Sequence, residues 1–358
     1  MKLLDRDRTP VRFTVITSVA SGLVLAGILT VVRTDLLARE WPAWAVLAVG
    51  GLAATPLLRM SKRHRQAFLV TSAFSQKYWV AGFVQQMHGV LDRAGIDLVL
   101  KVPGRDYDAS AQAHHLRRIL ATRHSYIGGA IDAAEVHRLR PDLAEFCREL
   151  ALPVVFADVE PFDDETEYPD NAAFVGYLGS DLGKLAGQWL VDHLRRRNRR
   201  RPHVLIVASQ EHSARQLMCT EALRAGLPDV SITLNDGCAF QRSRAYDAVH
   251  AHIRQLVARH ARLDAVFCTS DEMALGAVDA LRSANAGPVT ADTVVVGVDG
   301  IVEARTLIDS GTSPLRATVV QDSQRLAENV VHVLEKMHHH RRTVRRTILY
   351  PEIHQADR

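Results

Sequence analysis

Cysteine is scarce in this chain, and its spacing excludes the common thiolate metal sites. Only four cysteines occur in 358 residues, and no CxxC pair is present. Each lies in an apolar or helical stretch, where a buried free thiol is the usual state. The small number also argues against a strongly oxidising compartment.

Neither sign of charge is in large excess. Lysine and arginine number 44 against 40 acidic residues, a net charge of +4, which argues against a nucleic-acid binder. One run, residues 194–203, holds six arginines and is either a solvated helix end or a contact for anionic lipid or RNA. There is no HExxH, and residues 338–340 (HHH) are either a solvated helix end or a metal ligand set. We predict no catalytic residues, no metal and no cofactor.

Two long uncharged runs lie near the start of the chain. Residues 13–32 hold twenty uncharged positions and residues 41–58 hold eighteen, with Trp41 and Trp44 at the start of the second run. Twenty residues at about 1.5 Å each can cross a hydrocarbon core of ~30 Å. A signal peptide is the alternative, but the first run is long for one and no clear cleavage site follows. The pattern favours a membrane hairpin of two transmembrane helices.

The charges that flank these runs predict an orientation. Basic residues precede the first run and follow the second: Lys2, Arg6, Arg8 and Arg12, then Arg59, Lys62, Arg63 and Arg65. The short connection also contains arginines, but acidic residues offset them. The positive-inside rule therefore places both ends of the hairpin, and the soluble part, in the cytoplasm.

From residue 66 onward, short apolar runs alternate with amphipathic stretches. The strand-like runs are 66–72, 96–102, 126–131, 153–158, 172–177, 203–209, 230–235, 264–270, 293–300, 315–321 and 345–351. Apolar strands alternating with helices predict a parallel sheet covered on both faces. Because the pattern restarts after residue 202, we predict an α/β fold of two similar doubly wound lobes. We expect a hairpin over 1–65, one lobe over 66–179 plus 322–351, and the other over 180–321.

Polar and aromatic residues follow the ends of the predicted strands. They include Gln76, Tyr78, Trp79, Asp158, His212, Arg215, Ser270, Asp271, Asp299 and Gln321. Ligands of such sheets bind at the carboxyl ends of the strands. Carboxylates, amides and a guanidinium satisfy hydroxyl groups, and aromatic faces pack on the C–H faces of a sugar ring. With no nucleophile–base pair or metal set, the pattern indicates binding of a neutral, hydroxyl-rich molecule.

Four segments resemble the type I periplasmic sugar-binding proteins, the family of the ribose-binding protein and of the effector domains of lactose-repressor-type regulators. VFCTSDEMALGAV is similar to the family's "NDEMALGA" segment, and VVVGVDG to its "VVGFDG" strand. LRATVVQDSQRLAENVV and GSDLGKLAGQWL resemble two chain crossings. The four occur in the family's order and spacing within residues 66–351.

The resemblance implies a set of ligand contacts. Gln76 matches a position where the family has a polar amide, and Tyr78 and Trp79 match its pair of stacking aromatics. Asp158 matches an acidic residue of the family, and Arg215 matches an arginine. Asp299 and Gln321 match an acid and an amide near the family's hinge. Ser270 and Asp271 mark a strand tip that faces the cleft. Val159, Ser270 and Leu182 depart from the pattern of ribose binders, so a simple pentose is not implied.

Structural roles stay open for the same residues. Asp271 is also suited to cap a helix, and Glu272 to be a first-turn charge. Arg215 and Asp299 could form a salt bridge in the cleft, Gln321 could satisfy hinge backbone groups, and the aromatics could be core.

Two functions follow from the pattern. In the first, a membrane-anchored protein binds a sugar or polyol between two closing lobes and serves sugar uptake or sensing, with an ABC-type sugar permease as a partner and no nucleic acid. In the second, a cytoplasmic ligand sensor signals through its transmembrane hairpin or a membrane partner. Catalysis by the cleft carboxylates is the weakest alternative, because no acid–base pair can be placed.

Overall fold

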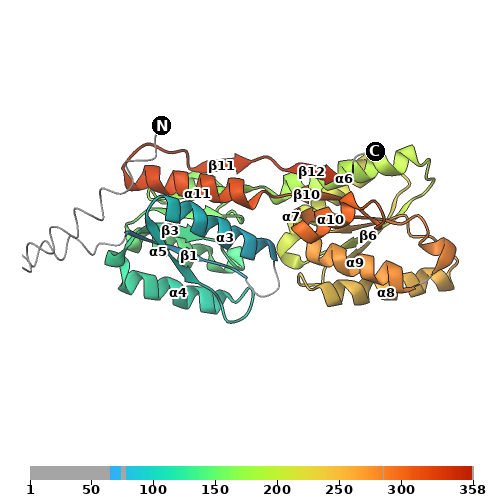
Figure 1. Cartoon of the computed structure of the whole chain (residues 1–358), viewed down its shortest axis with the longest axis horizontal. Helices are drawn as coiled ribbons and strands as arrows, with labels where there is room; N and C mark the ends of the chain where they lie inside the picture. The colour runs from blue at the N-terminus through green and yellow to red at the C-terminus, as the bar shows by residue number, and fades with distance from the viewer. Residues whose placement is uncertain (1–64, 74–77, 285, 357–358) are drawn as a thin grey trace, which may run out of the picture. The chain divides into compact units, whose positions relative to one another are not determined.

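The computed structural model describes residues 65–73, 78–284 and 286–356, which build two α/β lobes (Figure 1). The two apolar runs, 13–32 and 41–58, and Gln76 lie outside these described residues, so the membrane hairpin stays a prediction. Within the described part of the chain, no helix combines the length and the apolar character that crossing a bilayer requires.

The first lobe contains a six-stranded parallel sheet in the order β11-β5-β4-β3-β1-β2. Its strands are β1 Arg65–Val70, β2 Ile96–Lys101, β3 Tyr126–Ile131, β4 Val154–Ala157, β5 Ala172–Tyr177 and β11 Arg346–Leu349. Its helices are α3 Tyr78–Arg93, α4 Ala109–Ala121, α5 Val136–Leu150 and α11 Ser323–His338, with the short η2 Arg123–Ser125 and η3 Glu165–Glu167.

The second lobe has a six-stranded sheet in the order β12-β10-β9-β8-β6-β7, in which only β12 is antiparallel to its neighbour. Its strands are β6 His203–Val207, β7 Ser231–Asn235, β8 Ala265–Cys268, β9 Val294–Asp299, β10 Leu315–Val320 and β12 Glu352–Gln355. Its helices are α6 Gly179–Arg196, α7 Ser213–Gly226, α8 Arg242–Ala258, α9 Asp271–Ala284 and α10 Val302–Asp309, with η4 Gln210–His212 and η5 Gly287–Val289.

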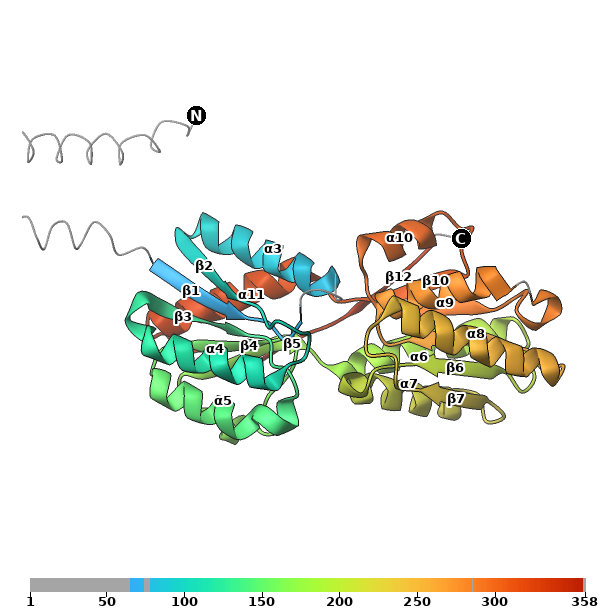
Figure 2. The ribbon, with the colours of Figure 1, turned by 90° about the horizontal axis from the view of Figure 1, so that it is seen from below.

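Helices cover both faces of each sheet, which explains why the inner strands are apolar throughout (Figure 2). In β1, successive side chains enter different clusters: Phe68 packs with α4 and α5, whereas Leu69 packs with α3 and α11. The side chains of β4, β5, β8 and β9 are entirely buried. The predicted two-lobed α/β architecture with parallel sheets is confirmed.

The chain passes between the lobes three times. The crossings fall between β5 and α6, between β10 and α11, and between β11 and β12. At the first two, the Tyr177 hydroxyl accepts from the backbone N–H of Asp322, with 3.1 Å between O and N. The turn at Gly300 is not a crossing, because β9 and α10 on either side of it belong to the same lobe.

Two elements were not predicted from the sequence. α10 lies in a stretch between two strong strand patterns, and it is only eight residues long. β12 has only four residues, of which half are exposed, so it lacks an apolar signal. β12 returns the end of the chain to the second lobe by pairing with β10.

Candidate ligand-binding cleft

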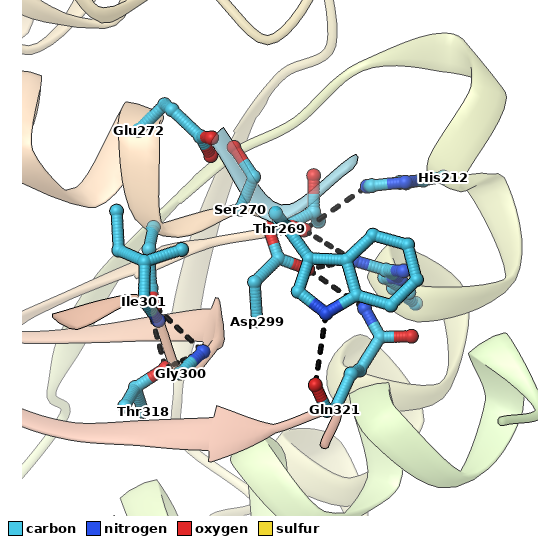
Figure 3. A network of polar contacts seen from close by, with 12 residues as sticks. His212, Thr269, Ser270, Glu272, Asp299, Gly300, Ile301, Thr318 and Gln321 are labelled. Carbon is cyan, nitrogen blue, oxygen red and sulfur yellow. Dashed lines mark hydrogen bonds and ion pairs between the residues drawn. The ribbon is translucent and has the colours of Figure 1, made fainter. Parts of the chain in front are cut away.

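Three of the predicted residues form one hydrogen-bonded network at the carboxyl ends of β9 and β10 (Figure 3). Asp299 Oδ1 accepts from Gln321 Nε2 at 2.7 Å and from Arg215 Nη1 at 3.3 Å. Arg215, Asp299 and Gln321 are 4%, 1% and 1% exposed, respectively. A buried carboxylate requires such donors, so the salt bridge foreseen as an alternative for Arg215 and Asp299 is present.

The position of Asp299 depends on an unusual backbone conformation. Its φ is 117° and that of Gly300 is 73°, both in the region that side chains other than glycine rarely adopt. Such conformations are retained where neighbouring contacts enforce them, and they concentrate at functional sites. Asp158, at the tip of β4 in the first lobe, is also buried and has a φ of 64°.

Asp271 supplies the contacts that hold this backbone. Its Oδ2 accepts from the N–H groups of Gly300 at 2.7 Å and Ile301 at 2.9 Å, and its Oδ1 accepts from the Thr318 hydroxyl at 2.7 Å. Burial, and then the nearby carboxylate of Asp299, raise the pKa of Asp271 well above its usual value. A Cβ on Gly297 would lie 2.1 Å from Asp271 Oδ1, so glycine in β9 makes room for this carboxylate.

The start of α9 therefore differs from the helix cap considered from the sequence. Ser270 Oγ, not Asp271, accepts from a first-turn N–H, that of Met273, at 3.4 Å. Asp271 is the first helical residue and points back to the β9–α10 turn. Both side chains are fully buried and engaged by their own lobe. Their direct contact with a ligand stays a prediction, whereas the partners of Asp271 give it a structural role.

Arg215 is positioned by the close packing of α6 on α7. A Cβ on Gly183 of α6 would lie 2.0 Å from the carbonyl oxygen of Arg215, so only glycine permits this approach. Arg215 Nη1 also donates to the carbonyl oxygen of Thr269 at 2.9 Å, and His212 Nδ1 lies 3.0 Å from the same oxygen. The strand tips of β6, β8 and β9 are joined through this arginine.

The predicted aromatic pair takes two different environments. Trp79 is 4% exposed, stacks on Phe83, and donates its indole N–H to the backbone oxygen of Gln321 at 2.8 Å. Tyr78 is 68% exposed. Both line a cavity of about 410 Å³ together with Asp299 and Gln321, so residues of the two lobes share it. Gln321 Oε1 is buried and accepts no hydrogen bond from the described residues.

Two further contacts join the lobes, and the sequence did not predict that these residues would link one lobe to the other. Glu272, at the start of α9, accepts from the backbone N–H of Tyr78 at 2.7 Å. Tyr107, before α4, stacks on Phe240, before α8, with ring centroids 4.8 Å apart. Phe240 also meets His212 edge-on. Nothing in the sequence pairs these distant positions, because each contact forms only when the lobes meet.

The first lobe contributes one acidic residue that the sequence could have indicated. Asp132 follows β3 as Asp158 follows β4, and it is buried. Its Oδ2 accepts from the Ser72 hydroxyl at 2.6 Å and the Ser72 N–H at 3.1 Å. Gln112 donates to the carbonyl oxygens of Thr71 and Asp132, which fixes this strand tip. A strand end followed directly by an acid was the available signal.

The strand tips in the described part of the chain offer fixed hydrogen-bonding groups. In the described residues, no group of three or more histidine, cysteine or acidic side chains is arranged to hold a metal ion. The four cysteines are buried free thiols, and burial raises the pKa of Cys147 to about 12 and that of Cys238 to about 11. Neutral thiols are poor nucleophiles. The fold and the site together define a two-lobed ligand-binding protein.

The chain belongs to the periplasmic binding protein family, because the model of the periplasmic binding protein domain matches residues 67–339. The ribose operon repressor of Escherichia coli is 24% identical over 277 residues, which cover 77% of this chain and 76% of the repressor. The repressor PurR of Mannheimia succiniciproducens is 27% identical over 203 residues, so the chain spans about half (55%) of that protein's length. The D-allose-binding periplasmic protein of E. coli is 32% identical, but over only 30% of this chain and 32% of its own length.

Solved structures share the fold. The arabinose-transporter binding protein of Shewanella sp. ANA-3 has a TM-score of 0.68 at 18% identity, covering 81% of this chain and 91% of its own. A D-allose-bound protein of Actinobacillus succinogenes has a TM-score of 0.70 at 16% identity, covering 81% and 96%. The family and these structures are binding proteins and not enzymes, as the sequence predicted.

Proposed function

We propose that this chain is a membrane-anchored carbohydrate-binding protein that holds a sugar or polyol between its two lobes, in sugar uptake or sensing. One observation carries the proposal. The network of Arg215, Asp299 and Gln321 lies beside a cavity that Trp79 of the other lobe also lines. A ligand in that cavity meets polar groups from one lobe and an aromatic ring from the other.

The charges of the cleft favour a neutral ligand. Three acidic residues, Asp299, Glu303 and Asp322, line the cavity with one cation, Arg305. Asp132, Asp158 and Glu272 are further acidic residues buried at the strand tips. Arg215 is already paired with Asp299. This excess of negative charge would repel a phosphate or carboxylate ligand. Hydroxyl groups are neutral and can donate hydrogen bonds to the carboxylates. The unused Oε1 of Gln321 is a further acceptor for a hydroxyl.

Ligand binding is proposed to act by changing the population of closed lobes. The three crossings permit a hinge motion, and the contacts of Glu272 with Tyr78 and of Tyr107 with Phe240 exist only when the lobes meet. A ligand that contacts both lobes lowers the free energy of the closed state alone, so it shifts the equilibrium towards closure.

The membrane anchor rests on the two apolar runs, 13–32 and 41–58. Their flanking basic residues favour a cytoplasmic soluble domain, whereas family members in uptake systems face outward. An outward-facing domain would deliver its ligand to an ABC-type sugar permease. D-Allose, arabinose and myo-inositol are the ligands that the names of several structural neighbours give for those proteins.

A cytoplasmic sensor is the second candidate, and two observations favour it. The basic residues on both sides of the predicted hairpin are one. The other is that relatives with high coverage are transcriptional repressors, including the ribose operon repressor. In this case closure would be transmitted to the hairpin or to a membrane partner.

A thermal-shift screen of the detergent-solubilised full chain tests ligand binding. Pentoses, hexoses, polyols and nucleosides are the probes, because a true ligand raises the melting temperature with the logarithm of its concentration. No shift with any neutral hydroxyl-rich compound would refute the proposed ligand class. A reporter active only outside the membrane, fused after Arg358, separates the uptake and sensor forms.

A further inference from the structure

The amino-terminal edge of the first sheet surrounds the point where the chain enters the lobe. Since all six strands are parallel, Arg65 of β1 and Arg346 of β11 begin at this same edge. α3 and α11 run back towards it and end at Arg93 and His338 (Figure 1). Burial, and then the charge of Arg65, lower the pKa of His338.

Residues 339–345 join α11 to β11 at this edge and carry an unusual composition. Arg341 and Arg342 are exposed and form no ion pair with the described residues. Val344 is 66% exposed beside them. Arg345 anchors the loop, because it pairs with Asp170 at 2.9 Å and donates to the carbonyl oxygen of Pro169 at 3.1 Å.

Other exposed groups share the edge, and both signs occur. The basic ones are Arg93, Arg123, His124, His339 and His340, and the acidic ones are Asp92, Asp97, Glu149 and Asp170. The acids lie in or next to other elements, whereas residues 338–345 contain none. Positive charge is therefore concentrated in this one loop.

In the proposed anchored form, the short connection brings this edge close to the bilayer. The second apolar run ends at residue 58, so six residues, 59–64, precede Arg65. Six extended residues reach about 20 Å at most. An edge tethered so closely lies within reach of the lipid headgroups, where basic residues are attracted to an anionic surface.

We infer that the loop of residues 339–345 binds the headgroups of anionic phospholipids and so fixes the first lobe against the membrane. Arg341 and Arg342 contact the phosphates, and Val344 enters the interface between headgroup and acyl chain. The inference rests on the proposed membrane anchor. It also places the ligand cleft, at the carboxyl edge of the same sheet, on the side of the lobe that faces away from the bilayer.

Hydrogen exchange of the full chain in lipid nanodiscs tests this inference. Nanodiscs of phosphatidylcholine alone are compared with nanodiscs that also contain phosphatidylglycerol. Peptides that cover residues 339–345 should exchange roughly tenfold more slowly with the anionic lipid, and high salt should remove the difference. The Arg341→Glu/Arg342→Glu variant should lose the protection. The matched control, Arg196→Glu/Arg200→Glu, reverses two exposed arginines of the second lobe and should keep it.

Each other outcome overturns the inference. Equal exchange in both lipids, loss of protection in the control, or the same protection from inorganic phosphate with neutral nanodiscs would each contradict it. Release of the wild-type chain from membranes by alkaline carbonate would refute the anchor and this inference together. A chain that stays in the membrane while the loop exchanges equally would refute the inference alone, and ligand-induced thermal shifts would be unaffected.

Discussion

The carboxylate of Glu272 in the second lobe accepts a hydrogen bond from the backbone N–H of Tyr78 in the first, with 2.7 Å between the atoms. Tyr78 begins α3, so the acidic group also meets the positive end of that helix dipole. Glu272 is 3% exposed, which strengthens the interaction by excluding water. One side chain therefore links the two lobes.

Replacing Glu272 with alanine should open the lobes in the absence of ligand. The charge-assisted bond across the cleft would be lost, which costs about 1.5–3 kcal/mol of closed-state free energy. Small-angle scattering of the detergent-solubilised chain should report a larger radius of gyration for Glu272→Ala, and a ligand should restore the wild-type value. Glu303→Ala, which removes an acid paired within the second lobe, is the control. Identical scattering of wild type and Glu272→Ala would rule out this link.

Changes in the Asp299 network should weaken ligand binding. Gln321→Ala removes both the donor to Asp299 and the buried Oε1 acceptor, so we expect a loss of affinity of roughly tenfold to a hundredfold. Isothermal titration with a ligand from the screen measures it. Gln324→Ala, an exposed amide at the start of α11, should leave the affinity unchanged. Unaltered binding by Gln321→Ala would exclude this residue from the site.

Asp271 should matter mainly to stability. Asp271→Asn places an amide N–H₂ group opposite N–H and O–H donors, which costs about 3 kcal/mol of the free energy of unfolding. Urea denaturation gives the value. Asp279→Asn alters an exposed acid of the same helix, and its effect should stay within about 0.5 kcal/mol. If both variants unfold at the same urea concentration, the turn after β9 does not depend on Asp271.

Acid should destabilise the second lobe through His252, whose ring meets that of His203 edge-on with ring centroids 5.0 Å apart. Burial, and then the charges of His203 and Arg259, lower the pKa of His252 from 6.5 to about 4. Between these pH values the unfolded chain binds more protons than the folded one, so the stability falls as the pH decreases from 6.5 to about 4. His252→Gln should flatten this dependence in urea titrations across that range, whereas His88→Gln on α3 should not. A slope unchanged by His252→Gln would assign the effect to other groups.

The sequence was sufficient for the elements whose pattern is strong. Strands such as β3 and β5 are continuous apolar runs, and they form over the predicted residues. Short or half-exposed elements such as β12 and α10 carry no comparable period, and their stability comes from neighbours that are distant in the sequence. The C-terminal return to the second lobe was missed for this reason.

Some residues of the candidate site could likewise be predicted from the sequence, and others could not. Asp299 and Gln321 could be named because each ends an apolar strand, and the structure brings them together. The structural role of Asp271 could not, because it depends on the space left by Gly297 and on a positive φ at residue 299. Glu272 and Tyr78 are 194 positions apart, so only a folded arrangement relates them.

Because β12 pairs with β10, the two described ends of this chain belong to different lobes. Residue 65 starts in the first sheet and residue 355 finishes in the second, so fluorophores attached near these positions would change their separation whenever the hinge bends. A fluorophore attached at the end of β12 would therefore serve in an optical sensor of ligand occupancy.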